Sequence, residues 1–498
     1  MQDIQEPVAV TRLSLPKGGG SLQGMGESLG TPGPDGVAQL SLPLPVSAGR
    51  GMAPALSLSY SSAGGNGPFG LGWQAGVMSV RRRTSQGVPA YDDQDTFIGP
   101  DNEVLVRELD SHGQPLVRET TTAQGVTLAQ RWRVTRFRSR TGAGAPRMEY
   151  WQPLAAGAFP FWLCHTPDGQ VHCLGQRADA RLSGPDNPEQ IAEWYLQESA
   201  SPDGEHISYH YAEENDAGTG TAEREAHPRV AQRYLQQVRY GNRTPRATLF
   251  AWDTTPPAPD EWLFTLVLDY GERPAGLNTV PALAAGGEWG LRADPFSRYD
   301  YGFEVRTRRL CRQVLMYHDV AALDGRPAAP PVLVSRLLLT YHASPSVTQL
   351  TGCRLLAHEP DGTPCARAPL SLGYQAFEPQ HAPAWRPLTG LQGFNDGLRY
   401  QWVDLYNEGM PGILYQDEHG WQYRAPERTP GTTDGITYGR PRLLPVPSLM
   451  QGGRLMDLTG DGRLDWLVAR PGLAGFYRRH PDKGWGDFTP LAALPTEF

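Results

Sequence analysis

Short alternating segments separated by tight turns constrain the fold of this chain more than any other feature of its sequence. Between about residue 130 and residue 375, apolar, aromatic and β-branched residues recur in short runs that predict strands at 149–152, 161–164, 171–175, 194–197, 206–211, 263–270 and 336–341. Pro-Asp-Gly sequences at 167–169, 202–204 and 360–362 separate several of these runs, and Asp-Gly between strands is a strong hairpin signal. The region shows neither a sustained helical period nor an alternation of strand and helix. We therefore expect an all-β fold made of a long succession of antiparallel hairpins.

The segment 41–97 is expected to begin this β architecture. Alternating residues at 40–45 and 56–61 predict two half-buried strands, and a third is predicted at 73–80. The sequence GNGPFG at 65–70 matches the G-x-G-x-x-G pattern of dinucleotide-binding loops, which requires a helix to open directly after the glycines. Pro68 and the apolar run after it predict a glycine-dense turn and another strand, so nucleotide binding is not expected.

Composition excludes several classes of function. The 498 residues carry a net charge of −8, which leaves no electrostatic footprint for nucleic acid, and no nucleic-acid partner is expected. The sequence has no apolar run long enough to span a bilayer and no conventional signal peptide, so direct membrane insertion is not expected. Five sparse cysteines favour a reducing compartment, which places the chain in the cytoplasm before release. Residues 1–39 are glycine-rich and are predicted to form a flexible leader.

Three clusters invite site hypotheses that the sequence does not favour. Asp92, Asp93 and Asp95 lack calcium-loop spacing, so we expect a solvated turn or ion pairs with the arginines at 81–83. The pairs at 164–165 and 172–173, Cys-His and His-Cys, face each other across a predicted hairpin and could bind zinc or form a disulfide. Because neighbouring strand residues point to opposite faces, we expect ordinary strand residues instead. Glu223 and Glu225 form an E-x-E pattern in the polar segment 212–230, which we expect to be a solvated loop.

An internal repeat begins near residue 385 when the sequence is shifted against itself by 53 positions. The residues that coincide without a gap are Asp404 with Asp457, Leu405 with Leu458, Gly409 with Gly462 and Leu414 with Leu467. One inserted residue then places Tyr423 on Tyr477 and Arg424 on Arg478. A period of about 50 residues made of short strands is typical of propeller blades. We expect residues 386–498 to form two blades of an incomplete β-propeller.

The second repeat contains a loop whose oxygen atoms suit Ca²⁺. The predicted ligands are the side chains of alternate residues together with one backbone carbonyl: Asp457, Thr459, Asp461, Arg463 (carbonyl) and Asp465. Gly462 permits the sharp turn that such a loop needs. The alternative is an Asp-rich turn whose carboxylates accept their own backbone amides. In the first repeat Tyr406 and Gly412 replace two ligands, so Asp404 and Glu408 are expected to hold a turn without metal.

These motifs together resemble a known family. The segments GMGE (24–27), SLPLP (41–45), LSLSYSS (56–62), GNGPFGLGW (65–73) and YDDQDTF (91–97) are similar to the opening of the SpvB-type domain. That family comprises the Salmonella virulence plasmid 65 kDa B protein and the B component of insecticidal Tc toxin complexes. The segments VDLYNEGMPGILY (403–415) and DLTGDGRLDW (457–466) resemble the FG-GAP propeller units that follow this domain in the B component. The resemblance implies an SpvB-type β domain at 40–385.

The resemblance implies a secreted, non-enzymatic structural component of a bacterial toxin complex. In Tc toxins the B component and the Rhs-repeat C component form a hollow β-shell that encloses an unfolded toxic C-terminal polypeptide. The B propeller docks onto the pore-forming A component. A strip of hairpins whose free edges pair onward, instead of closing locally, would suit such a shell.

Other interpretations stay open from the sequence. Two blades do not close a propeller, so the chain is either a truncated reading frame or a split B component completed by another chain. A cell-surface, adhesin-like propeller protein is one alternative function. An ADP-ribosyltransferase using Glu225 is another, although the sequence has no G-x-S-x-G, H-E-x-x-H or P-loop motif.

Overall fold

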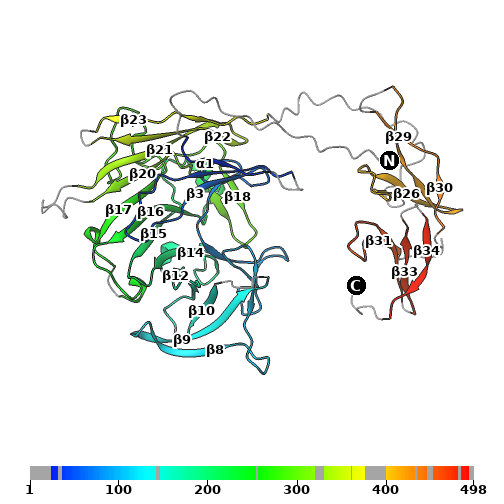
Figure 1. Cartoon of the computed structure of the whole chain (residues 1–498), viewed down its shortest axis with the longest axis horizontal. Helices are drawn as coiled ribbons and strands as arrows, with labels where there is room; N and C mark the ends of the chain where they lie inside the picture. Colours follow the sequence, from blue (N-terminus) through cyan, green and yellow to red (C-terminus); the bar gives the residue numbers. More distant parts are fainter. Residues whose placement is uncertain are drawn as a thin grey trace, which may run out of the picture. The chain divides into compact units, whose positions relative to one another are not determined.

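The chain divides into two compact units, Met1–Tyr374 and Gln375–Phe498. The computed structural model describes residues 24–31, 36–141, 146–253, 256–319, 330–359, 362–375, 400–431, 435–445, 453–470, 472–480 and 484–492. Both units consist mainly of antiparallel strands (Figure 1), which confirms the predicted all-β fold. The domain boundary predicted at 385 lies outside the described residues.

The first unit begins with a four-stranded sheet. Its strands are β1 (Ser28–Leu29), β2 (Gln39–Pro43), β3 (Ser57–Ser61) and β4 (Trp73–Ala75). The predicted flexible leader is wrong for residues 24–31, because β1 pairs with β2 and Met25 is buried in the core. The predicted strand at 73–80 is two strands: β4 ends at Ala75, and β5 (Ser79–Arg82) belongs to a different sheet.

The second sheet of the first unit partly closes on itself. Its closed circuit consists of β5, β6 (Phe97–Ile98), β7 (Val104–Arg107), β9 (Val126–Ser139), β10 (Arg147–Pro153), β11 (Phe161–His165), β12 (Val171–Leu174) and β14 (Ile191–Ala200). Two more strands, β8 (Val117–Ala123) and β13 (Arg181–Ser183), pair with β9 and β14. The expectation that the hairpins do not close locally is therefore wrong for this part of the chain.

Aromatic side chains from these strands explain the closure. Phe97, Phe137, Tyr150, Trp162 and Trp194 come from five different strands of the circuit and pack against one another with centroid distances of 4.6–6.3 Å. All five belong to the main buried cluster. Large rings facing inward from every side bury more apolar area in a closed circuit than on a flat strip, and this favours closure.

From β14 the sheet continues as a strip. β14 pairs with β13 and β5 through its first half and with β12 and β15 through its second half. The strip then runs through β15 (His206–Glu213), β16 (Arg233–Asn242), β17 (Trp262–Asp269), β20 (Gln313–His318), β21 (Val332–Ala343) and β22 (Thr348–His358) to β23 (Pro364–Ala366) and β24 (Leu370–Ser371). Here the predicted hairpin succession is confirmed, with a Pro-Asp-Gly turn at 202–204 between β14 and β15.

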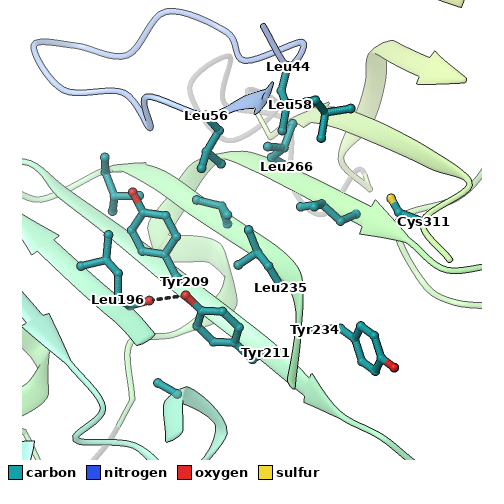
Figure 2. Packing of buried hydrophobic residues seen from close by; sticks show 14 of the residues in the cluster. Leu44, Leu56, Leu58, Leu196, Tyr209, Tyr211, Tyr234, Leu235, Leu266 and Cys311 are labelled. Atoms are coloured by element: carbon teal, nitrogen blue, oxygen red, sulfur yellow. Dashed lines mark hydrogen bonds between the residues drawn. The ribbon is translucent and has the colours of Figure 1, made fainter. Parts of the chain in front are cut away.

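The inner face of the strip packs against the N-terminal sheet. Figure 2 shows Leu44, Leu56 and Leu58 lying over the strand that carries Leu266. The hydroxyl of Tyr211 donates a hydrogen bond to the carbonyl of Leu196 at 2.7 Å, which satisfies a buried polar group within this core. The two sheets therefore bury one shared apolar layer.

Smaller elements lie between the strands of the first unit. A two-stranded hairpin is formed by β18 (Phe296–Arg298) and β19 (Val305–Thr307). The helix α1 (Thr221–Ala226) lies in the segment 212–230, so the prediction of a loop is wrong for these six residues, none of which is buried. Short 3-10 turns occupy Ala178–Ala180, Phe250–Trp252 and Pro259–Glu261.

The second unit contains two four-stranded sheets and a separate hairpin. The first sheet consists of β25 (Tyr400–Val403), β26 (Gly412–Asp417), β27 (Gly420–Arg424) and β30 (Arg442–Leu443). The second consists of β31 (Gly453–Met456), β32 (Asp465–Arg470), β33 (Leu473–Arg479) and β34 (Trp485–Pro490). The hairpin is β28 (Pro426–Arg428) with β29 (Ile436–Tyr438).

The two sheets repeat the same structure at a shift of 53 residues. The first residues of β31, β32 and β33 lie 53 positions after those of β25, β26 and β27. Tyr423 lies opposite Leu414, and Phe476 lies opposite Leu467. Tyr423 thus corresponds to Phe476, so the predicted one-residue insertion that placed it on Tyr477 is wrong. The strand register therefore continues the shift of 53 residues from β32 into β33 without a gap.

Candidate functional site

The G-x-G-x-x-G segment and the two residues after it (65–72), called the clasp below, form hydrogen bonds to distant segments of the first unit. Residues 65–72 connect β3 to β4 without a helix, and the strand that follows Pro68 is β4, which begins at Trp73. The Asn66 amide donates to Asp294 Oδ2 at 2.9 Å, and the Arg292 guanidinium donates to Asn66 Oδ1 and to the Gly67 carbonyl, each at 2.8 Å. Arg292 and Asp294 form a buried ion pair at 2.9 Å. These contacts fasten the N-terminal sheet to the segment before β18.

The clasp also reaches the strip. The Cys311 amide donates to the Pro68 carbonyl at 2.8 Å, and the Leu71 amide donates to the Thr348 carbonyl at 2.9 Å. A Cβ atom at Gly70 would lie 2.9 Å from that same Thr348 oxygen. The glycines of this motif therefore allow close backbone approach within the protein itself.

The Asp92–Asp95 turn is organised by an arginine, as one of the sequence alternatives predicted. Arg82 Nη1 lies 2.6 Å from Asp95 Oδ2, and its guanidinium also lies over the rings of Phe97 and Trp194. Asp95 accepts further hydrogen bonds from the backbone amides of residues 90 and 91. Asp92 and Asp93 accept from Gln94 N and Gln152 Nε2, respectively.

The Cys and His residues of the β11–β12 hairpin point into different environments. Cys164 belongs to the main core cluster, whereas Cys173 packs in a separate cluster on the other face of the sheet. Burial raises the pKa of the Cys164 thiol to about 12 and that of Cys173 well above its usual value. His172 Nδ1 lies 2.8 Å from Ser199 Oγ. Both thiols are free, and their positions suit strand packing.

The E-x-E segment lies in α1, where arginines from the β19 region engage its first glutamate. Glu223 accepts from Arg306 Nε at 2.6 Å and from Arg308 Nε at 3.0 Å. Arg306, followed by the other contacts with these two arginines, lowers the pKa of Glu223. Glu225 is exposed. Glu223 is therefore held in an ion-pair network, and Glu225, the residue of the ribosyltransferase alternative, lies on the surface.

Sequence reasoning missed how deeply this arginine network is buried. Arg309 Nε lies 2.7 Å from Glu214 Oε1, and both side chains are fully inaccessible to solvent. The second oxygen of Glu214 accepts from the Tyr234 hydroxyl at 2.5 Å. A run such as RTRRL at 306–310 is expected on a solvated face, whereas in the folded chain the segment 212–230 supplies buried acceptors such as Glu214.

Four of the five predicted calcium-binding residues lie in the turn between β31 and β32, and Asp465 is the first residue of β32. Asp457 Oδ1 accepts from the amides of Thr459, Gly460 and Asp461, and its Oδ2 accepts from Gly462 N at 2.8 Å. These amides, that of Gly462 most strongly, lower the pKa of Asp457. The first repeat has the same turn, because Asp404 accepts from the amides of Glu408 and Gly409.

The other predicted ligands are used differently. Asp461 Oδ1 accepts from Arg463 N at 2.9 Å. Asp465 is buried in β32, where Oδ1 accepts from Arg479 N and Oδ2 has no hydrogen-bond donor. In the ranges that the structure describes, no three His, Cys, Asp or Glu side chains converge as a metal would require. The Asp-turn alternative accounts for Asp457, and calcium binding stays a prediction.

No helix among the described residues is long and apolar enough to cross a membrane.

A family model and one curated relative match most of the chain. The model, described as the Salmonella virulence plasmid 65kDa B protein (SpvB), matches residues 32–320. The Mono(ADP-ribosyl)transferase SpvB of Salmonella typhimurium (strain 14028s / SGSC 2262) is 48% identical over 363 residues, which cover 73% of this chain and 59% of that protein. The chain thus spans less than two thirds of the length of the curated relatives it matches.

Two solved structures are similar in both sequence and fold. A chain of the Tc holotoxin pore of Photorhabdus luminescens is 48% identical with a TM-score of 0.83, covering 99% of this chain and 23% of that chain. The N-terminal domain of the effector protein SpvB from Salmonella typhimurium strain LT2 is 48% identical with a TM-score of 0.61. This second match covers 64% of the present chain and 98% of that domain.

Proposed function

The chain belongs to the SpvB family, and from this premise we propose that it is a structural component of a secreted Tc-type toxin complex. The family membership inferred from the sequence motifs is confirmed. The observation that carries the proposal is the match to the Tc holotoxin chain, which includes both units at 48% identity over 99% of this chain. The match covers only part of that larger protein, so the shell, the partners and export from the cytoplasm are proposals for this chain.

We propose that the strip of the first unit forms part of a shell that an Rhs-repeat C component completes around a toxic C-terminal polypeptide. The strip supports this role because β23 and β24 each pair with β22 on one side only. All three residues of β23 are exposed. An unpaired strand edge is a template for further strands.

The second unit is proposed to dock onto the pore-forming A component. Its two sheets carry exposed apolar side chains, with Trp402 57% and Leu443 58% accessible. Incomplete propellers leave such surfaces for another chain or further blades to cover. Glycan binding by this unit without any toxin partner would instead favour the adhesin-like alternative.

A non-enzymatic role is part of the proposal. It is supported by the ion pairs that occupy Glu223 and by the match of this chain to a structure described as the N-terminal domain of SpvB. NAD⁺ hydrolysis should be equally absent from the wild-type chain and from Glu225→Ala. Hydrolysis by the wild type that Glu225→Ala abolishes would contradict the proposal.

Co-expression with an Rhs-repeat C component tests the shell directly. We expect a stable complex by size-exclusion chromatography with light scattering, and protection of the C-terminal polypeptide from added protease. Ala366→Lys on β23 should weaken the complex, because a charge at a strand edge opposes pairing. Thr121→Lys on the exposed strand β8 is the matched control and should leave the complex intact. A monomeric chain that never protects the polypeptide would overturn the proposal.

Calcium binding by the 457–465 loop is a separate proposal. Asp461→Ala should lower the melting temperature in Ca²⁺ and not in chelator, because Asp461 would act mainly through the ion. Asp457→Ala should lower it in both conditions, since four backbone amides lose their acceptor. Equal effects of Asp461→Ala in both conditions would exclude the cation.

A further inference from the structure

A cavity lies on the outer face of the strip, away from the core described above. Its volume is about 580 Å³, and its floor includes Ser208 and His210 of β15 and Arg239 of β16. Phe250 and the proline-rich residues 256–259 line the opposite wall. Strand alternation explains this floor: Tyr209 and Tyr211 point into the core, so Ser208 and His210 point outward.

Arg239 is a half-buried cation without an acceptor among the residues that the structure describes. It lies opposite Ser208 on one side and Thr265 on the other, and its guanidinium has no hydrogen bond or ion pair with any residue in the described part of the chain. Burial, followed by the like charge of Arg177, lowers the pKa of Arg239. Partial removal of a guanidinium from water without a partner is unfavourable, and a bound anion would offset that effect.

The carboxylates around the cavity are already engaged. Glu198 accepts from His206 Nδ1 at 2.8 Å and from the amides of Phe250 and Ala251. Asp253 is paired with Arg246, and Asp179 is paired with Arg177. None of these acids is hydrogen-bonded to Arg239, which lines the cavity.

The imidazole of His210 adds no charge to this site near neutral pH, because its pKa is lowered. Burial, and then the charges of Arg177 and Arg239, lower the pKa of His210 to about 4, against a smaller opposing effect of Asp179. His210 Nε2 lies 3.1 Å from Ser208 Oγ, so both side chains can adjust their hydrogen bonds to a ligand. The floor therefore combines a fixed positive charge with adaptable polar groups.

A second cavity continues beyond Arg239. It also has a volume of about 580 Å³, shares Arg239, and is lined by Val267, Leu283 and Pro331 among other apolar residues. Arg239 thus lies between two cavities: the first has a polar floor with Phe250 and prolines opposite it, and the second is lined mainly by aliphatic residues and proline. Such a charge within an apolar setting is typical of sites for organic anions.

We propose that these cavities bind a small organic acid whose carboxylate is held by Arg239 and whose apolar part packs against Phe250 and the proline-rich wall. The planar guanidinium matches a carboxylate with two parallel hydrogen bonds. The site lies outside the strand edges and propeller surfaces of the proposed function, and it does not depend on that proposal.

The test uses the full chain and 2-naphthoate as the probe, with 2-naphthalenemethanol as its uncharged analogue. By calorimetry, naphthoate should bind more tightly than the alcohol. Arg239→Gln should reduce naphthoate affinity about tenfold or more and leave the alcohol unchanged, whereas Arg239→Lys should retain part of the affinity. Arg138→Gln, at an exposed strand arginine of β9, is the matched control. Circular dichroism and melting temperature verify that each variant folds.

NMR titration of His210 provides a second readout. Bound naphthoate should raise the pKa of His210 by about one unit, because a negative charge favours the imidazolium. Inorganic phosphate, tested in parallel, distinguishes a general anion site from one that needs the apolar part. The proposal is overturned if naphthoate and the alcohol bind equally, if Arg239→Gln binds naphthoate as the wild type does, or if phosphate alone competes as well as naphthoate.

Discussion

Buried arginines determine how several loops of the first unit are arranged, which apolar packing alone would not do. Arg292, Arg308, Arg309 and Arg336 are almost fully inaccessible, and each has acceptors in loops far away in sequence. A buried charge is tolerated only when it is paired and hydrogen-bonded. Each arginine therefore fixes one arrangement of its loops, because any other arrangement would leave the charge without a partner.

Arg292→Met tests this at the clasp. The substitution leaves Asp294 buried without its cation, and removal of one partner of a buried pair costs about 3–5 kcal/mol. We expect a loss of this size in the free energy of unfolding, measured by urea denaturation. Arg131→Met, which breaks the exposed pair with Glu119 at 2.9 Å, should cost about 1 kcal/mol or less. Similar losses in the two variants would contradict the assigned role of burial.

His210 should make the first unit sensitive to acid. Its pKa is about 4 in the folded chain and lies near its ordinary value of 6.5 when unfolded, so the unfolded chain binds the extra proton first. Its contribution to stability is complete above pH 6.5 and is lost as the pH falls toward 4. Melting temperatures measured across this range should fall less steeply for His210→Gln. If the melting temperatures of the wild type and of His210→Gln fall equally with pH, His210 does not contribute to the acid sensitivity.

Among the elements, the 64–72 loop shows how one segment can be fixed by its neighbours. Gly70 has φ of +89° and faces the Thr348 carbonyl, whereas Gly65 has open space where a Cβ atom would lie. Positive φ disfavours any residue with a Cβ atom, and the close carbonyl adds a steric clash. Within the same motif, Gly70 thus cannot be replaced without strain, whereas Gly65 can accept a larger side chain.

Gly70→Ala should destabilise the chain by about 2 kcal/mol, since it combines backbone strain with a clash against backbone. Gly65→Ala is the control within the same loop and should change stability by less than about 0.5 kcal/mol. Thermal unfolding of both variants measures the difference. Equal melting temperatures of the Gly70→Ala and Gly65→Ala variants would contradict the assigned strain and close contact at Gly70.

At the scale of the whole molecule, each buried apolar cluster among the described residues belongs to one of the two units. Four clusters consist of residues from the first unit, and one, which includes Leu414, Tyr423 and Trp466, consists of residues from both repeats of the second. Trp421 and Trp466 join those repeats with ring centroids 5.0 Å apart. Separate cores imply separate cooperative units.

We expect calorimetry of the full chain to show two unfolding transitions. Trp466→Ala should lower the temperature of only one transition. It should reduce the free energy of unfolding of the second unit by about 3–5 kcal/mol, because it removes a buried aromatic side chain. Arg292→Met should lower only the other. A single transition shifted by both substitutions would show that the units unfold together.

Local sequence patterns predicted many of the strands and the repeat of the second unit. Strand positions followed from alternation and Asp-Gly turns, as in the β14–β15 hairpin, because side-chain period and turn conformation are set by a few adjacent residues. The 53-residue repeat was visible for the same reason. The Asp457 turn was foreseen only as an alternative to calcium, since identical carboxylates can accept backbone amides or bind an ion.

The sequence by itself determined that the chain is β-rich, repeats in its second unit and carries the family's motifs, because each of these rests on residues close together in the chain. Only the tertiary structure decided that the strands around Trp162 close into a circuit, that Arg292 and Arg309 are buried, and that Arg239 faces an open cavity. These features depend on which distant segments supply the partner rings and acceptors. No local pattern contains that information, since pairing and burial arise only when the sheets pack.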